Sequence, residues 1–179
     1  GGEMTTLRRN STHVVTLDQL DSLYQTSLSE AERARRNAYN RIFKRISVGI
    51  VFHVLVEGET TFVSGSNLEH PMPQLCSCAE LIGIGAMHSQ SLVDFAVGIT
   101  IVAQKRAQPR DRLILPCDMC RSRLVQLAEW SGVGDDFTII AANPDYKKGG
   151  RILLTNLGFL LQDERLRYSP EGIDRDTLL

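Results

Sequence analysis

The sequence predicts an α/β fold, a three-layer α/β/α sandwich around a mixed sheet of about five strands. Segments with helical and strand periodicity follow one another in the order α-β-β-α-β-α-β-β-α. Such an order places helices on both faces of a sheet. The chain has 179 residues, 42% of them hydrophobic and 23% charged, which is typical of a soluble globular domain that buries one core.

We expect one domain over residues 16–168, with a flexible N-terminal extension (1–15) and a loosely held polar C-terminal tail (169–179). The formal net charge of −1 gives no bias toward nucleic acid or anionic membranes. No apolar run reaches the roughly 18 residues of a transmembrane helix. Four cysteines without a secretory signal are more typical of metal ligands or free thiols than of disulfides, which predicts a cytoplasmic protein.

The first helix is expected over Thr16 to Arg45, where leucines recur at helical spacing and Ser27 or Ser29 can cap a run of helix formers. The second half of this segment is rich in arginine and lysine. Two interpretations are open, a face that binds phosphate or RNA and a solvated face balanced by nearby acids. The second is the commoner arrangement.

A β-hairpin follows. Ile46 to Val56 is β-branched and apolar, Glu57-Gly58-Glu59 is turn-like, and Thr60 to Val63 resumes as a strand. An apolar helix is then expected over Cys78 to Ser89. The second half of the chain is expected to contain, in order, a buried strand (95–104), a loop ending at Pro116, a helix (117–130), two strands (137–142 and 151–155) around a turn, and a last helix (157–166).

The cysteines carry the chemical signal. Cys117 and Cys120 have the Cys-x-x-Cys spacing that lets two thiolates at a helix N-terminus bind one ion, and the helix dipole favours their ionisation. Cys78 or Cys76 can supply a third ligand. A catalytic zinc ion keeps one coordination position for water, and Glu80 lies at the start of the same helix as Cys78.

Together these residues match the zinc nucleobase deaminase signature H-x-E…P-C-x-x-C, with cysteine as the first ligand. Here it is Cys78-Ala79-Glu80 followed by Pro116-Cys117-Asp118-Met119-Cys120. The pattern predicts Zn²⁺ as cofactor, which lowers the pKa of water toward neutrality. Glu80 is the predicted catalytic residue, which moves the proton of that water to the substrate.

Two points stay open at this stage. A purely structural zinc site could use Cys76 as fourth ligand, although a single residue separates it from Cys78 and such a site has no need of Glu80; Cys76 is expected to be a packed thiol beside the site. Three thiolates on one Zn²⁺ also leave a net negative charge. Arg121 is either the donor that hydrogen-bonds to sulfur and withdraws this charge or an ordinary surface arginine.

With these motifs, the chain from Ala34 to Gln162 resembles the small tetrameric cytidine deaminases and the related blasticidin S deaminases. "NAYNRIFKRISVG", "VSGSNLEH", "CAEL", "PCDMCRSRL" and "ILLTNLGFLLQ" are similar to the segments of that family. The resemblance implies a homotetramer whose active sites draw on neighbouring subunits. It also implies that Asn67 and Glu69 hold the sugar of a nucleoside, with Phe43 and Ala79 among the substrate contacts.

The chain departs from the family pattern at several positions. Ile46 replaces an aromatic residue expected to stack on the base, and Leu81 replaces an arginine, as in the blasticidin S deaminases. His70 stands where asparagine is usual, and Phe159 and Gln162 replace a glutamate and a proline. These departures suggest a divergent specificity.

The predicted function is zinc-dependent hydrolytic deamination of a cytosine nucleoside to the uracil form, with release of ammonia. The alternatives are an antibiotic nucleoside of the blasticidin S type, a nucleotide or a polynucleotide as substrate, and a non-catalytic zinc-stabilised interaction module. No zinc-binding role is assigned to His13, His53 or His88. Trp130 and Phe137 are expected in the core, with contacts between subunits as the alternative.

Overall fold

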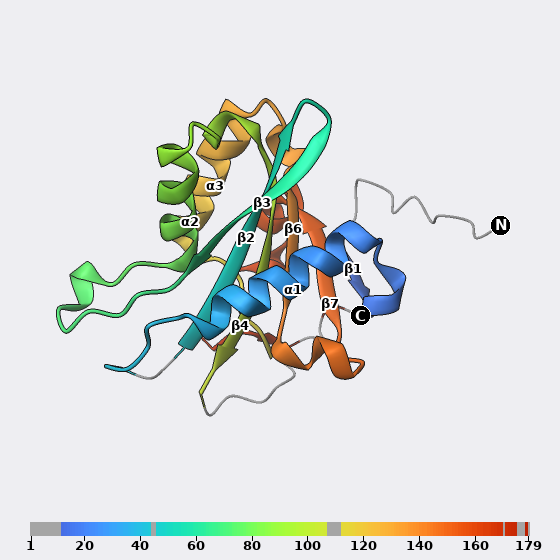
Figure 1. The fold of residues 1–179 in the computed structure, drawn as a ribbon. Coiled ribbons are helices and arrows are strands. Elements are labelled where there is room, and N and C mark those ends of the chain that lie inside the picture. The colour runs from blue at the N-terminus through green and yellow to red at the C-terminus, as the bar shows by residue number, and fades with distance from the viewer. Residues whose placement is uncertain (1–11, 44–45, 107–111, 170, 175–177, 179) are drawn as a thin grey trace.

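A mixed six-stranded sheet of order β1-β7-β6-β4-β2-β3 forms the centre of the computed structural model (Figure 1). The structure describes residues 12–43, 46–106, 112–169, 171–174 and 178. Its strands are β1 (His13–Val15), β2 (Ile46–Val56), β3 (Glu59–Ser66), β4 (Ala96–Lys105), β6 (Thr138–Ala142) and β7 (Ile152–Asn156). β4 and β6 pair in parallel, and the other neighbours are antiparallel. β5 (Arg112–Leu113) and β8 (Ile173–Asp174) form a separate antiparallel pair.

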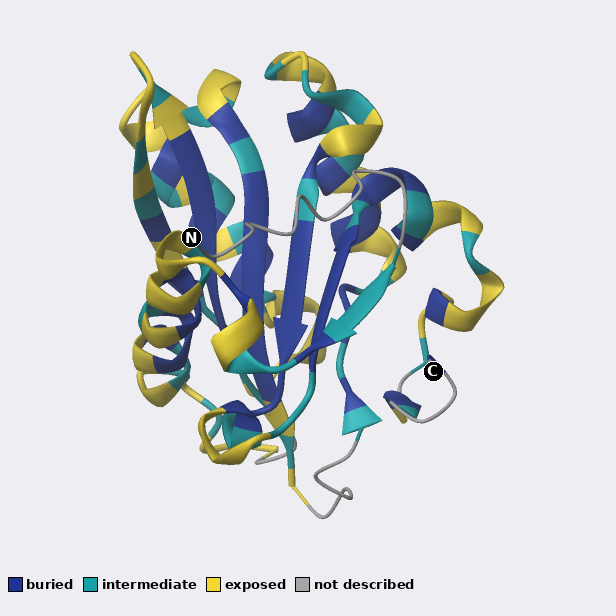
Figure 2. Ribbon diagram, turned by 90° about the vertical axis from the view of Figure 1, so that its right-hand side faces the viewer, coloured by how far each residue is buried: buried dark blue, intermediate teal, exposed yellow. Residues whose placement is uncertain are grey.

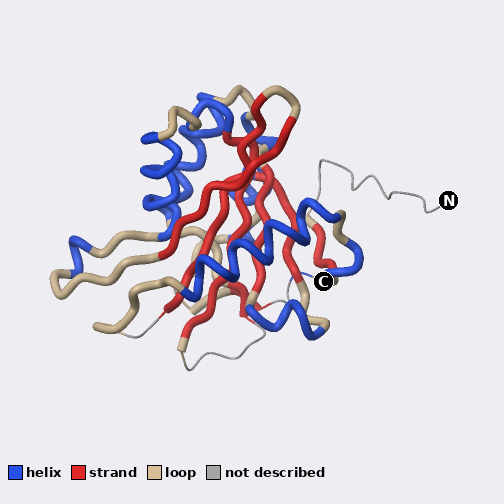
Figure 3. The backbone as a smooth tube through the Cα atoms, viewed as in Figure 1, coloured by secondary structure: helices blue, strands red, loops and turns tan. Residues whose placement is uncertain are grey.

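Helices cover both faces of the sheet, which confirms the three-layer prediction. α1 (Ser22–Arg36) crosses one face, whereas α2 (Ala79–Ser89), α3 (Asp118–Trp130) and the short α4 (Leu157–Gln162) pack on the other (Figures 1 and 3). The hairpin β2–β3 and the helices α2 and α3 form close to their predicted positions.

The alternation of side chains along each strand divides the apolar residues between two cores. On β4, Ile99 and Ile101 face the core under α2 and α3, and Val102 faces the core under α1. The central strands are buried along most of their length, and the outward sides of the helices are exposed (Figure 2).

Two glycines allow the helices to approach the sheet closely. A Cβ atom on Gly49 of β2 would overlap the main chain of Ala31 and Arg35 in α1. A Cβ atom on Gly65 of β3 would overlap the carbonyl oxygen of Ala79, at the start of α2. The metal-motif helix α2 is therefore seated directly on β3.

The predicted first helix was too long. α1 ends at Arg36, and its N-cap is Asp21, whose side chain accepts a hydrogen bond from the Tyr24 main chain, rather than Ser27 or Ser29. Ser27 is buried inside α1. The arginines of the helix pair with its own acids, Arg33 with Glu30 and both Arg35 and Arg36 with Glu32, as the solvated-face interpretation expects. Of the other basic residues of that segment, Arg41 lies over the Tyr39 ring, and Lys44 and Arg45 lie outside the described residues.

The two ends of the described chain are more ordered than the sequence suggested. His13–Val15 is not a flexible extension but pairs with β7 as a sixth strand of the sheet. In the expected loose tail, Ile173 pairs with Leu113, and Ile173 and Leu178 are buried in the core under α2 and α3. The remainder of the predicted extension, residues 1–11, lies outside the described residues.

None of the helices in the described ranges is long and apolar enough to cross a membrane.

Candidate metal centre and pocket

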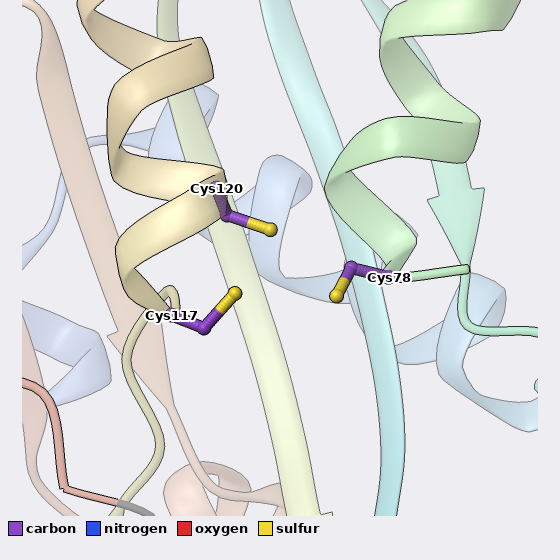
Figure 4. A group of neighbouring side chains, drawn as sticks. All are labelled: Cys78, Cys117 and Cys120. Carbon is purple, nitrogen blue, oxygen red and sulfur yellow. The ribbon is translucent and has the colours of Figure 1, made fainter. Parts of the chain in front are cut away.

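Three predicted zinc ligands come together where two helices begin. Cys78 is the N-cap residue of α2, Cys117 is the N-cap residue of α3, and Cys120 lies in the first turn of α3. Their sulfur atoms all lie within 4.8 Å of one another. Figure 4 shows the side chain of Cys78 pointing from α2 toward Cys117 and Cys120 on α3.

The helix termini make this a favourable place for thiolates. The first main-chain N–H groups of a helix have no partner within the helix, and those of Met119 and Cys120 in α3 lower the pKa of Cys117. The positive ends of two helix dipoles converge there. Both effects favour negatively charged sulfur.

The thiols influence each other strongly. Hydrogen bonds from Cys120 and Cys78 lower the pKa of Cys117 to about 2. Hydrogen bonding with Cys117 raises the pKa of Cys78 to about 12 and also raises the pKa of Cys120. The proximity of the three thiols thus opposes the ionisation of all of them together, and a cation between them would favour it.

The three thiols fit a zinc ion. Zn–S bonds of about 2.3 Å in a tetrahedron place sulfur atoms roughly 3.8 Å apart. The observed limit of 4.8 Å needs only small side-chain rotations to reach this separation. Three thiolates leave one tetrahedral position open, as in catalytic zinc sites.

Glu80 lies beside the thiols in the first turn of α2, with 6% of its surface exposed. Burial raises the pKa of its carboxyl to about 7, and the charge of Cys117 adds to the effect. A carboxyl group that exchanges its proton near neutral pH is suited to general acid–base catalysis.

Cys76 does not join this cluster. Its side chain is exposed, not packed as expected, and its sulfur contacts the main chain of His70, accepting from the nitrogen at 3.3 Å and donating to the oxygen at 3.5 Å. The metal-ligand group found among the described residues contains only Cys78, Cys117 and Cys120. This grouping gives no support to Cys76 as a fourth ligand.

A pocket of about 600 Å³ opens in front of the thiols. Cys78, Cys117 and Glu80 line one side of it. The four residues expected to contact substrate also line it, namely Phe43, Asn67, Glu69 and Ala79. Ile46, at the position of the missing aromatic residue, is part of the wall as well.

The polar groups of Asn67 and Glu69 are engaged by the main chain around the pocket. Asn67 Oδ1 accepts a hydrogen bond from the Val48 nitrogen at 2.7 Å, and Nδ2 donates to the Ile46 oxygen at 3.2 Å. Glu69 Oε2 accepts from the nitrogens of Ile42 and Phe43, both at 2.9 Å. Both side chains therefore hold other parts of the pocket wall.

Arg121 is not a surface arginine. It is 7% exposed and donates to the carbonyl oxygens of Pro116 at 2.9 Å, Leu160 at 2.8 Å and Leu166 at 2.7 Å. Burial lowers its pKa, and the charges of Asp118 and Cys117 oppose this. Its hydrogen bonds within the described chain go to carbonyl groups rather than to sulfur, although its charge still acts on the nearby thiolate.

Tyr168 is a pocket residue that sequence reasoning missed. Placed by sequence at the edge of the polar tail, it lines the pocket and is 37% exposed. Burial raises its pKa, with further contributions from Cys117 and Cys78, which places its ring near the thiols. The only signal in the sequence was an aromatic residue in a polar segment. The pocket wall thus carries Phe43 and Tyr168 in place of an aromatic residue at position 46.

The other candidates lie elsewhere. His53 is buried and its Nε2 contacts Thr100 Oγ1 at 2.8 Å; His13 lies in β1 and His88 in the last turn of α2. None of the three belongs to the thiol group found among the described residues. Phe137 is fully buried, as predicted, whereas Trp130 is 51% exposed at the end of α3 and does not belong to the core.

The fold and site together define a class, α/β proteins with a buried carboxyl beside three thiols that could hold a metal ion. The chain is similar to cytidine deaminases of solved structure. For the enzyme of Burkholderia pseudomallei, the identity is 21% and the TM-score 0.62, over 78% of this chain and 97% of that one. For the enzymes of Mycobacterium tuberculosis and Mycobacterium leprae, the identity is 23% and the TM-scores are 0.55 and 0.54, over 80% of this chain and 97% and 100% of theirs.

The fold of the chain is therefore that of the cytidine deaminases, as the motifs led us to expect. No family model matches the sequence, and no curated protein matches it. The similarity is thus seen in the arrangement of helices and strands.

Proposed function

We propose that the protein is a zinc-dependent hydrolytic deaminase acting on a cytosine nucleoside, which it converts to the uracil form with release of ammonia. One observation carries this proposal: the buried carboxyl of Glu80 lines one pocket together with Cys78 and Cys117, two of the three clustered thiols that could hold a metal ion. A structural zinc site has no use for such a carboxyl. The fold shared with cytidine deaminases supports the same reaction class.

Each residue has a defined task in this reaction. Cys78, Cys117 and Cys120 would hold the zinc ion, which would supply a Lewis acid that makes water nucleophilic near neutral pH. Glu80 accepts the proton of the attacking water and passes it to the ring nitrogen of the base. The water oxygen bonds to the ring carbon that carries the amino group. Glu80 then moves the proton of the resulting hydroxyl group to that amino group, whose bond to the ring carbon breaks as ammonia leaves. Its burial keeps these protons out of bulk water.

The pocket supports an uncharged nucleoside as substrate. Phe43 and Tyr168 offer flat apolar surfaces for a pyrimidine, and no lysine or arginine occurs among the described lining residues. A nucleotide phosphate would call for such a cation. The arginines of α1 that could bind a polynucleotide are paired with Glu30 and Glu32.

We also propose, from the resemblance to small cytidine deaminases, a homotetramer that works in the cytoplasm, where free thiols stay reduced. Apolar side chains are exposed on the two loops beside the pocket, among them Ile42, Leu68, Met72 and Leu75. A neighbouring subunit would remove them from water. Light scattering coupled to size-exclusion chromatography measures the subunit number, and a monomer at micromolar concentration would contradict this assembly.

The ultraviolet absorbance of cytidine, deoxycytidine and blasticidin S, each incubated with the zinc-loaded protein, tests the function. We expect a spectral change with cytidine or deoxycytidine. In Glu80→Gln the rate should fall by at least about 100-fold because the proton carrier is lost, with zinc content unchanged by metal analysis. Glu129→Gln, on the exposed side of α3, is the matched control and should keep its activity.

A change with blasticidin S alone would assign the protein to the antibiotic nucleosides instead. No change with any of the three, in a protein that holds one zinc ion tightly, would overturn the proposal of a nucleoside substrate.

A further inference from the structure

Residues 67–69 lie between two parts of the pocket wall and are called here the connecting segment. On one side, the main-chain oxygen of Asn67 accepts a hydrogen bond from the main-chain nitrogen of Tyr39 at 3.0 Å. The main-chain nitrogen of Glu69 donates one to the main-chain oxygen of Tyr39 at 2.8 Å. On the other side, Leu68 and Ser77 exchange main-chain hydrogen bonds of 3.0 and 2.9 Å. Ser77 directly precedes the metal ligand Cys78. The connecting segment thus joins the loop of residues 39–43 to the metal motif.

The carboxylate of Glu69 adds a second link to that loop. One oxygen atom, Oε2, accepts hydrogen bonds from the successive nitrogens of Ile42 and Phe43, both at 2.9 Å. Hydrogen bonds from N–H groups to an ionised carboxylate are about twice as strong as neutral ones. Glu69 is 8% exposed, so water competes little for these bonds.

The position of Phe43 depends on this anchor. Its side chain lines the pocket and yet is 39% exposed, so burial in a core does not fix it there. The main chain that carries it is bound at its own nitrogen by Glu69. Asn67 plays a parallel part at the start of β2, where its amide group binds Ile46 and Val48, two other residues of the wall.

We propose that Glu69 is a positioning residue for the base of the substrate. Its carboxylate holds the loop of residues 39–43 so that Phe43 forms one side of the pocket. This role differs from the sugar contact that the family resemblance implies for Glu69. The part of the inference that concerns the substrate rests on the proposed function.

Limited proteolysis tests the anchor without any substrate. Trypsin cleaves after Arg41, at the peptide bond that contains the first of the two anchored nitrogens, and mass spectrometry follows that product. Glu69→Ala should be cleaved there about tenfold faster, because two charge-assisted hydrogen bonds are lost. Glu69→Gln keeps an oxygen that can accept both hydrogen bonds and should stay within about threefold of the wild type. Glu129→Ala is the control, and an unchanged rate in Glu69→Ala would overturn the proposal.

Binding of uridine and uracil to the zinc-loaded protein tests the role toward the base. Glu69→Ala should weaken both ligands by the same factor, about fivefold or more, because base stacking on Phe43 is lost. Glu69→Ala combined with Phe43→Ala should bind no more weakly than Phe43→Ala alone. Weaker binding of uridine with unchanged binding of uracil would instead make Glu69 a sugar ligand.

The two tests separate the two proposals. If neither uridine nor uracil binds to the wild-type protein, the proposed function fails, and cleavage after Arg41 still decides whether Glu69 anchors the loop.

Discussion

Arg121 is the side chain that joins the metal motif to the end of the chain. Its guanidinium group donates to Pro116, just before Cys117, and to Leu160 and Leu166 in and beyond α4. Tyr168 follows two residues after Leu166 and reaches the pocket. One buried cation therefore fixes both the start of α3 and the path of the segment that carries Tyr168.

Removal of the Arg121 side chain should destabilise the folded protein. Arg121→Ala leaves three buried carbonyl groups without their donor, and we expect a loss of unfolding free energy of about 3 kcal/mol or more. Chemical denaturation measures it. Arg123→Ala, on the same helix, removes an exposed side chain bonded to Gln126, and its effect should stay within about 0.5 kcal/mol. Equal effects for the two substitutions would contradict the structural role of Arg121.

His53 closes a chain of buried hydrogen bonds between α1 and the sheet. The Ser27 hydroxyl donates to the Tyr24 oxygen at 2.8 Å and so accepts from Thr100 at 2.7 Å. Thr100 then accepts from Nε2 of His53 at 2.8 Å, so Nε2 carries a proton. Burial lowers the pKa of His53 to about 4.

This histidine makes stability depend on pH. The unfolded chain protonates His53 below about pH 6.5, whereas the folded protein does so only near pH 4, so stability falls as the pH drops through this window. At pH 4.5 the loss is about 2.5 kcal/mol. His53→Gln should lose less stability than the wild type between pH 7 and 4.5, by about that amount. Parallel curves of unfolding free energy against pH for the two proteins would contradict it.

At the scale of elements, α2 rests on the sheet through a glycine. A Cβ atom on Gly83 would lie 2.6 Å from Ile50 Cδ1 and 2.9 Å from Phe52 Cε2, inside the core. Gly85, two residues further along the same helix, is exposed and would meet nothing within 4 Å. The two glycines therefore lie on opposite sides of the same helix, Gly83 against the core and Gly85 toward solvent.

The same substitution should therefore act in opposite directions. Gly85→Ala should stabilise the protein by about 0.5–1 kcal/mol, because alanine has the higher helix propensity. Gly83→Ala should destabilise it by about 1–3 kcal/mol through overpacking. Thermal unfolding measures both variants. A stabilising Gly83→Ala would mean that α2 has room to move away from β2.

Sequence periodicity located the long helices and strands. It failed where tertiary contacts determine the end of an element or the position of a short strand. β2, β3, α2 and α3 are long enough for their apolar spacing to be read, and they lie close to where it predicted. The end of α1 was missed because residues 37–43 contain no strong helix breaker. Their loop is held by hydrogen bonds from residues 67–69, far away in sequence. β1, with 3 residues, and β8, with 2, are too short for any periodicity.

For the whole molecule, the C-terminal segment is part of the structure that shapes the pocket. Ile173 pairs with Leu113 and packs in the core. Glu171, two residues before it, forms a salt bridge of 3.3 Å with Lys105 of β4.

The thiols and Glu80 were predictable because their chemistry fixes local spacing. Tyr168 was not, because only the path of the complete chain brings it to the pocket.

Truncation of a single side chain in this segment should reveal its role. Ile173→Ala removes a buried side chain and should lower the unfolding free energy by about 2 kcal/mol. Leu161→Ala removes a side chain that is 47% exposed on α4 and should have an effect below about 0.5 kcal/mol. Chemical denaturation measures both effects. If the two substitutions had equally small effects, the prediction of a loosely held C-terminal tail would be supported instead.

The exposure of Cys76 has a practical consequence. It is the exposed thiol at the pocket rim, while Cys78 and Cys117 are half-buried and Cys120 is buried. An alkylating reagent should modify Cys76 first, and a zinc ion bound as proposed would shield the other three sulfur atoms until a chelator removed it. Mass spectrometry of the alkylated protein then counts the added groups. The number of cysteines that react quickly therefore measures how much of the protein holds a metal ion, and the measurement requires no substrate.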